Sequence, residues 1–288
     1  MSDDAIESLL GRRTTLPIRR LAAPGALLAV DPLDRDPDAA VILLPRAEVP
    51  DGARVGDRVE VFVYLDSDDR PIATTRRPAI ALGEVRFLEV TAVTPIGAFV
   101  DWGLPKELLV PYAEQSKELH VGERQPIGLY LDKTGRLAGT MLVGELLGLA
   151  PRRFGNDEWI EGEAWRNDPD VGLFAILERS FVGLVPASEP HRLRRGQAAR
   201  FRVAYVQPDG KVVLSLRRHA HQELAADADT IVAVLSGPRA PRVGDHSDPE
   251  LIRELFGLSK KAFKRAVGGL LKARKVTLDE SGCVVVVR

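Results

Sequence analysis

Basic side chains concentrate in one short segment near the C-terminus, where they have the chemistry to bind phosphate groups. The segment 259–275 contains seven Lys and Arg residues and no Asp or Glu. These are Lys260, Lys261, Lys264, Arg265, Lys272, Arg274 and Lys275. A row of cations attracts a nucleic-acid backbone by releasing its counterions. The same row also fits the solvated face of a surface helix, so charge alone leaves both interpretations open.

Further cations lie upstream of this segment, and together with it they divide the chain into an acidic and a basic half. Residues 1–78 and 79–145 each have a net charge of −3, whereas residues 146–220 and 221–288 have +3 and +2. The upstream candidates for phosphate contact are Lys106, Arg152, Arg153, Arg192, Arg194, Arg195, Arg200, Arg217 and Arg218. A whole-chain charge of −1 therefore hides a basic C-terminal half.

Residue patterns of common enzyme classes are missing. The single Cys283 excludes a disulfide framework and a cysteine-based zinc cluster. No phosphate-binding glycine loop occurs, and none of the five histidines forms a His-Glu-x-x-His motif. His219 and His221 alone cannot fill a metal site. We therefore expect a protein that is not an enzyme and that needs no metal or cofactor.

A signature of the form Leu-x-Pro-x-x-Glu occurs three times, at residues 43–48, 109–114 and 184–189. A glycine follows each proline at a spacing of 10 or 11 residues, and a strand-like run, a polar turn and a last short strand come next. Upstream of each signature we expect a longer strand broken by a glycine: Gly25, Gly97 and Gly172. Residues 31–38 form an insertion in the first copy. Five short strands per copy predict a small Greek-key barrel of the OB-fold kind.

The pattern changes after about residue 215, where helical periodicity begins. We predict short helices over 225–236 and 249–256, with Asp248 as the N-cap of the second, and a third helix from Ser259 to about Arg274. Two strands, 276–278 and 283–287, follow. Three helices and a hairpin in this order are typical of a winged helix-turn-helix.

The stretch from Gly97 to Gln115, with its Gly-Ala-Phe-Val and Asp-Trp-Gly-Leu segments, resembles S1-type OB-folds. In its longer form it resembles the conserved virulence factor B family of bacterial RNA-binding proteins, as do Phe256–Lys264 and Gly268–Leu270 in the tail. The resemblance implies a mainly β chain with a C-terminal α+β domain, in which three tandem S1-like barrels precede a winged helix. The implied domains are 1–78, 79–145, 146–220 and 221–288.

S1-like domains stack bases on exposed aromatic residues, and the resemblance assigns this role by position. The positions are Ile96, Phe99 and Pro111 in the second barrel and Val171, Phe174 and Pro186 in the third. Phe99 and Phe174 are the aromatic members, whereas the first barrel has Leu27 in that place. Stacking on RNA and packing at the edge of the core both remain open for these two residues. Trp165 is a further stacking candidate, and for Trp102 we expect core packing.

We expect a cytoplasmic RNA-binding protein that regulates gene expression after transcription and has single-stranded RNA as its partner. The third barrel and the winged helix would share a basic RNA face, and the acidic first two barrels would contact protein partners. An acidic N-terminus and the lack of an apolar run of ~20 residues favour the cytoplasm. Two alternatives stay open: a DNA-binding transcription regulator and a protein-binding scaffold of the translation or RNA-decay machinery.

Overall fold

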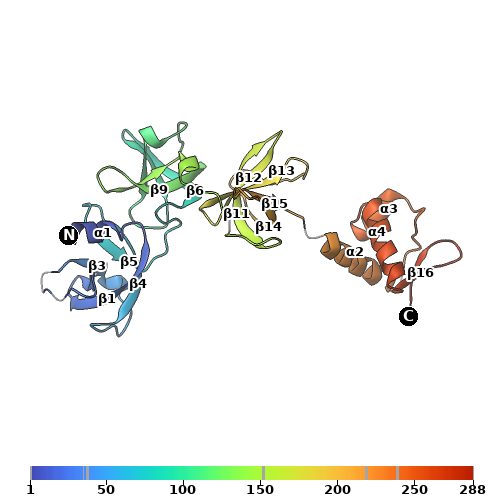
Figure 1. Cartoon of the computed structure of the whole chain (residues 1–288), viewed down its shortest axis with the longest axis horizontal. Helices are drawn as coiled ribbons and strands as arrows, with labels where there is room; N and C mark the ends of the chain where they lie inside the picture. Colours follow the sequence, from blue (N-terminus) through green and yellow to red (C-terminus); the bar gives the residue numbers. More distant parts are fainter. Residues whose placement is uncertain are drawn as a thin grey trace. The chain divides into compact units, whose positions relative to one another are not determined.

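The computed structural model describes residues 2–34, 36, 39–150, 153–217, 220–237 and 240–287, with the backbone alone for residues 2–4 and 220–226. The chain forms two compact units, Met1–Leu216 and Arg217–Arg288 (Figure 1). A short helix, α1 (Ser2–Glu7), opens the first unit, which otherwise consists of β-strands and the short 3-10 helices η1 (Arg46–Glu48), η2 (Tyr112–Glu114) and η3 (Val143–Glu145).

Three five-stranded barrels make up the first unit. The first is closed in the order β1-β2-β3-β5-β4, the second is a sheet in the order β10-β9-β6-β7-β8, and the third is closed in the order β11-β12-β13-β15-β14. The strands of the first two barrels are β1 (Arg13–Ala22), β2 (Gly25–Ala29), β3 (Val41–Pro45), β4 (Arg58–Leu65), β5 (Pro71–Thr74), β6 (Val85–Thr94), β7 (Gly97–Asp101), β8 (Leu108–Pro111), β9 (Arg124–Leu131) and β10 (Leu137–Thr140). Those of the third are β11 (Trp159–Asp168), β12 (Gly172–Leu177), β13 (Phe181–Pro186), β14 (Ala198–Val206) and β15 (Val212–Ser215). The predicted mainly β fold class is confirmed.

The glycine upstream of each signature begins the second strand of its barrel. Our expectation of one long strand broken by glycine was wrong in this respect, because the first strand ends before the glycine and a turn separates the two. Gly97 pairs with Pro111 of β8, and the same glycine–proline pairing occurs in the other two barrels. At Gly97 φ is 148°, and a Cβ there would lie 2.3 Å from the Val110 carbonyl oxygen. The glycine of each repeat is therefore required because the backbone of the second strand comes so close to that of the third strand that no Cβ fits.

The glutamate of the signature ties the third strand to the end of the last strand. Glu48 accepts hydrogen bonds from the Thr74 hydroxyl and the Thr75 backbone N–H, both at 2.6 Å. In the third barrel Glu189 accepts them from the Ser215 hydroxyl at 2.9 Å and the Leu216 N–H at 2.6 Å. Burial acts to raise the pKa of Glu48, but its hydrogen bonds and the nearby Arg76 outweigh burial and hold the pKa below its ordinary value.

The second unit has three helices and a two-stranded wing. They are α2 (Ala220–Leu235), α3 (Pro249–Phe256), α4 (Lys260–Lys272), β16 (Val276–Leu278) and β17 (Val284–Val286). Asp248 and Ser259 cap α3 and α4, accepting hydrogen bonds from the N–H groups of Glu250 and Ala262, as expected for their residue types. The first helix begins five residues before the predicted Ala225. Apolar residues of all three helices and both strands form one core, and the architecture is a winged helix.

Replacing Gly97 by alanine should strongly destabilise the second barrel. The Cβ clash and the positive φ together should cost roughly 2–5 kcal/mol of unfolding free energy. Gly144→Ala is the matched control, because no atom lies within 4 Å of a Cβ at that position in the same barrel. Urea unfolding followed by circular dichroism measures both variants. Equal stability of the two variants would contradict the close approach.

Replacing Glu48 by glutamine should lower stability in a pH-dependent way. Near pH 7 we expect a loss of roughly 1.5–3 kcal/mol, the usual range for hydrogen bonds to a charged group. The folded-state pKa of Glu48 lies below the ordinary pKa of a glutamate. Wild type should therefore lose this stability advantage as the pH falls from the ordinary glutamate pKa through the lowered pKa of Glu48. Urea unfolding midpoints of wild type and Glu48→Gln at about pH 7 and about pH 3 measure this stability difference. A pH-independent difference, or an equal effect of the exposed Glu60→Gln, would contradict the assignment.

Candidate nucleic-acid interface

A row of side chains crosses the outer face of the third barrel, with one residue from each strand. Strand pairing places them opposite one another: Arg166 (β11), Phe174 (β12), Leu184 (β13), Val213 (β15) and Tyr205 (β14). Paired residues share one face of a sheet, and their neighbours Leu173, Ala175 and Val185 point into the core. Tyr205 is 50% exposed, and Phe174 is half-buried. We call these five residues the third-barrel row.

Arg166 is a functional candidate that the sequence analysis missed. Its guanidinium lies 4.4 Å from the ring centroid of Phe174 and 5.2 Å from that of Trp165, so it stacks against both. Trp165 is the bulged residue of β11, and the register shift lets adjacent residues contact each other on this face. Bases stack on guanidinium planes as well as on aromatic rings. The only advance signal was the Trp-Arg pair in the strand preceding Phe174.

Tyrosine occupies the equivalent of Tyr205 in all three barrels, but its surroundings differ. Tyr64 in the first barrel is 8% exposed and lies edge-on to Trp102, with 6.4 Å between ring centroids. Trp102, predicted as a core residue, is buried at this junction between the first two barrels. In the second barrel, burial and the nearby carboxylates of Glu114 and Asp132 raise the pKa of Tyr130 to about 12. Of these three tyrosines, only Tyr205 lies on an open face.

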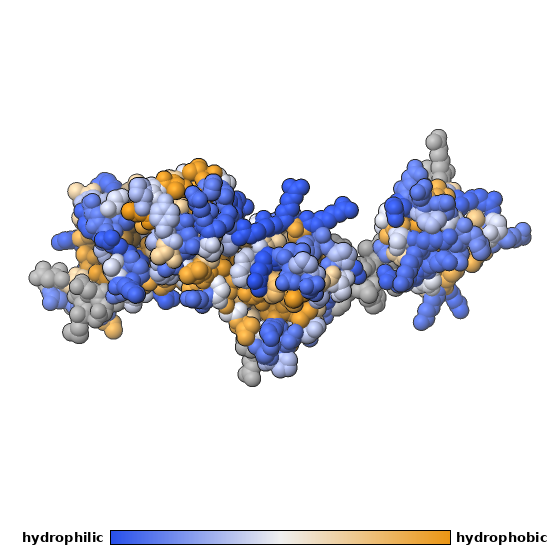
Figure 2. Space-filling view, turned by 90° about the horizontal axis from the view of Figure 1, so that it is seen from above, coloured by the Kyte–Doolittle hydropathy of each residue, from blue (hydrophilic) through white to orange (hydrophobic). Residues whose placement is uncertain are grey.

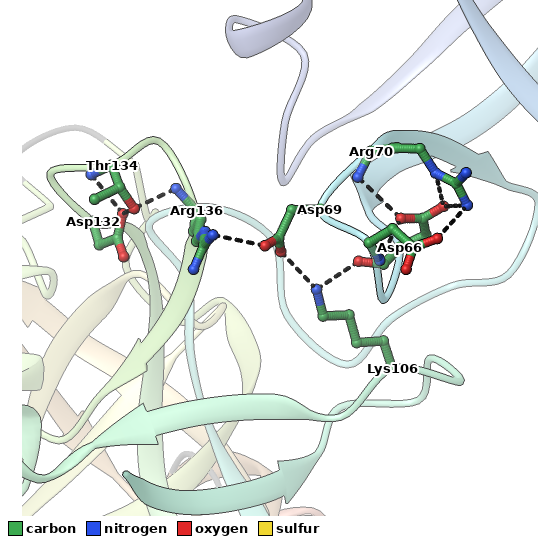
Figure 3. Close-up of polar contacts among 8 residues, drawn as sticks. Asp66, Asp69, Arg70, Lys106, Asp132, Thr134 and Arg136 are labelled. Carbon is green, nitrogen blue, oxygen red and sulfur yellow. Dashed lines mark hydrogen bonds and ion pairs between the residues drawn. The ribbon is translucent and has the colours of Figure 1, made fainter.

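Phe99 and Lys106 lie together at the junction of the first and second barrels. Both line a cavity of about 200 Å³, which Pro111 also borders. The Lys106 Nζ lies 2.6 Å from the Asp66 carbonyl oxygen and 3.2 Å from Asp69 Oδ1, so its contacts here are to the first barrel (Figure 3). The structure thus places these two predicted residues beside a neighbouring barrel.

The predicted cations of the third barrel fall into separate groups. Arg192 and Arg194 are exposed, and their guanidinium groups make no ion pair or hydrogen bond within the described part of the chain. Their loop lies beside the strand end that carries Arg166, because His191 Nε2 contacts Asn167 Oδ1 at 3.2 Å. Arg200 stacks over Trp159 at 5.8 Å, near the opposite end of β11. The loop that carries Arg192 and Arg194 therefore contacts the residue next to Arg166 of the third-barrel row.

The other predicted cations of this region have partners or lie elsewhere. Arg195 donates to Gln125 Oε1 at 2.6 Å and lies over Phe87, at the junction with the second barrel. Arg153 pairs with Glu178 at 2.7 Å. Arg217 is exposed and belongs to the second unit. Arg152 and Arg218 lie outside the described residues.

A cleft of about 510 Å³ lies between the second and third barrels and is lined by several glutamates, among them Glu84, Glu158 and Glu161. Its lining contains five glutamates and the two arginines Arg86 and Arg179, so its net charge is negative and disfavours a phosphate backbone. Within the described residues no cluster of three or more His, Cys, Asp or Glu has the arrangement of a metal site. In the same part of the chain no helix is long and apolar enough to span a membrane.

Helix α4 divides its cations between two faces. Lys260 donates to the Ser247 carbonyl oxygen at 2.9 Å, and Lys264 pairs with Asp245 at 2.7 Å, so both hold the loop before α3. The exposed residues Lys261, Arg265 and Lys272 follow helical spacing and form a stripe, which we call the α4 stripe. Arg274 and Lys275 extend the positive charge beyond the helix end. Figure 2 shows a largely hydrophilic visible face on this unit.

Comparisons with known proteins agree with this architecture. An S1 domain model matches residues 10–76 and 82–142, and a CvfB-like winged helix domain model matches residues 229–283. The uncharacterized protein YitL of Bacillus subtilis strain 168 is 33% identical over 250 residues, which are 82% of each chain. Conserved virulence factor B of Staphylococcus epidermidis ATCC 12228 is 30% identical over 86% of this chain and 89% of its own. The chain belongs to the conserved virulence factor B family.

A solved structure, described as a multidomain protein with nucleic acid binding domains from Streptococcus pneumoniae TIGR4, covers 97% of this chain and 99% of its own. Its sequence identity is 26% and its TM-score is 0.41. The S1 domains and the winged-helix domain of this CvfB-like chain are types of domain that bind nucleic acids. The third-barrel row and the α4 stripe are the surfaces on which that type of binding has to be tested.

Proposed function

We propose that this chain is a non-enzymatic, cytoplasmic protein that binds single-stranded RNA and regulates gene expression after transcription. The observation that carries the proposal is the third-barrel row, where Arg166, Phe174 and Tyr205 offer stacking surfaces on an open barrel face. Single-stranded RNA exposes the faces of its bases, whereas a duplex hides them in its stack. Arg192 and Arg194 supply cations for the backbone.

The α4 stripe supports a second contact with the same class of ligand. Lysine and arginine on an exposed helix suit phosphates and carry little base specificity, and the helix has no Asn or Gln to read adenine. Because one chain connects the two units, binding at one raises the effective concentration of RNA at the other. We expect weak sequence preference and strong dependence on salt.

Fluorescence anisotropy with labelled single-stranded RNA and labelled duplex DNA, each at low and physiological salt, tests the proposal. Tighter binding to RNA, weakening with salt, is expected. Tighter binding to duplex DNA would contradict the proposal and favour a transcription regulator that uses α4 in the major groove. No binding by folded protein would also contradict it and favour a scaffold for protein partners.

Removing an aromatic from the third-barrel row should weaken RNA binding without changing its salt dependence. For Phe174→Ala and for Tyr205→Ala we expect a loss of ~1–3 kcal/mol each, the range for one stacked base. Tyr112→Ala is the control for Tyr205, because Tyr112 is also 50% exposed but lies outside the row. Anisotropy titrations of each variant measure the loss. Unchanged affinity in folded variants would show that these residues do not stack on RNA.

Neutralising the α4 stripe should reduce the salt dependence of RNA binding. In the triple variant Lys261→Ala/Arg265→Ala/Lys272→Ala, each lost phosphate contact should lower the slope of log K against log salt by about 0.7. The control removes three exposed cations of the first two barrels, Arg54, Lys117 and Lys133, and so changes net charge equally. The stripe has no role in RNA binding if both triple variants give the same slope.

A further inference from the structure

The wing of the second unit has one covered edge and one open edge. On the β17 side, Gly244 bridges to Cys283, and the Val284 N–H donates a hydrogen bond to the Val243 carbonyl oxygen at 2.8 Å. Within the described residues no strand lies on the other side of β16, and the sheet has the order β16-β17 (Figure 1). β16 is therefore an edge strand.

The register of the wing decides which backbone groups of β16 point outward. The Lys275 carbonyl oxygen accepts a hydrogen bond from the β17 side at 3.0 Å, and the Asp279 N–H donates one to that side at 2.9 Å. In an antiparallel ladder the residues at alternate positions, Val276 and Leu278, direct their N–H and C=O groups away from the neighbouring strand. These outward groups make no backbone hydrogen bond in the described part of the chain. They form a short template on which another strand can pair.

β16 lacks several features that protect edge strands from pairing. Its residues Val-Thr-Leu include no proline and no charge, and its pairing with β17 has no bulge. Leu278 lies on the same face as the buried Val276, yet it is 49% exposed. A strand paired with β16 would cover this apolar side chain.

The charged residues on both sides of β16 indicate which strand fits this edge. Arg274 and Lys275 precede β16, and Asp279 and Glu280 follow it. Antiparallel pairing with a second copy of the same strand places Lys275 opposite Asp279 of that copy. One position further, Arg274 lies opposite Glu280. Pairing in the parallel direction would instead bring like charges together, so the segment is complementary to itself only when antiparallel.

The outer pair of charges is available for a partner. Arg274 and Glu280 are both exposed, and neither makes an ion pair within the described residues. Asp279 already pairs with Arg242 of its own chain at 2.9 Å, so Lys275 of a second copy would join an existing ion pair. An interface in which each residue meets its complement on an identical surface is the arrangement that a two-fold axis requires.

We propose that the β16 edges of two copies of this chain pair antiparallel and join their wings into one continuous sheet. The pairing does not depend on RNA. Because β16 is only three residues long, the interface is small, and we expect a weak dimer with a dissociation constant of about 10–100 μM. The edge uses no residue of the α4 stripe, so a dimer presents two such stripes to one polyanion.

Sedimentation velocity of the full chain without RNA, over concentrations that span this dissociation constant, tests the proposal. Lys275→Glu should raise the dissociation constant roughly tenfold, because it places like charges opposite each other at both ends of the symmetric edge. Lys272→Glu is the matched control, since it changes the charge equally on the neighbouring helix outside the edge, and it should dimerise like wild type. A wild type that stays monomeric, or an equal effect of the two variants, would overturn the proposal.

A mixing experiment tests the antiparallel register itself. Arg274→Glu alone and Glu280→Arg alone should each weaken the dimer, because each creates two repulsive pairs. An equimolar mixture of the two variants should dimerise again, since every pair then joins opposite charges. The register is wrong if the mixture associates no better than the separate variants.

Leu278→Pro tests the backbone contact, because proline removes an N–H that points away from β17. We expect the dimer to be lost, with a cooperative thermal unfolding transition retained. Dimerisation that persists in folded Leu278→Pro would place the contact on another surface and overturn the proposal. If this variant does not fold, the mixing experiment decides, because its two substitutions lie at exposed positions outside the strand.

Discussion

Burial of Trp102 between the first two barrels decides which surfaces of this protein are open to a ligand. The indole packs edge-on against Phe62 and Tyr64, with centroid distances of 5.9 and 6.4 Å, and it donates a hydrogen bond to the Lys106 carbonyl oxygen at 2.6 Å. This contact buries Tyr64, the first-barrel equivalent of Tyr205, and holds the loop that carries Lys106. An apolar contact of this kind is costly to open, so the Tyr64 ring is not available to stack on a base.

The third barrel lacks such a cover over its row. Residues of the second barrel pack against Ile176 and Trp165, which lie close to Phe174 and Arg166 along their strands. Phe174 and Leu184 nevertheless remain half-buried, and Tyr205 remains exposed. The three copies of one fold therefore differ in their surroundings: Tyr64 is packed against Trp102 in the first, Phe99 borders a cavity at the junction of the first and second barrels, and Tyr205 is exposed in the third. Divergence between the copies lies in their contacts, since the backbone pairing of glycine and proline is the same in all three.

Sequence reasoning succeeded where chemistry is local and failed where it depends on distant contacts. The N-caps Asp248 and Ser259, and strands such as Arg58–Leu65 and Leu137–Thr140, follow from residue types and spacing within a few positions. Arg166 was missed because its stack needs the bulge in β11 and the register of β12. Distant contacts also decide which charged side chains are free. Lys260 and Lys261 are adjacent in the sequence, but only Lys260 donates a hydrogen bond to the Ser247 carbonyl oxygen of the loop before α3.

Ultraviolet cross-linking of uridine-rich RNA to the full chain, with the attachment sites located by mass spectrometry, tests most directly the claim that the third barrel has an open stacking face. The account predicts cross-links at Phe174, Tyr205 and Trp165, and none at Tyr64, the buried equivalent of Tyr205. Cross-links confined to the first barrel, or to the winged helix alone, would contradict it. Because all three barrels are present in one chain, each serves as the internal control for the others.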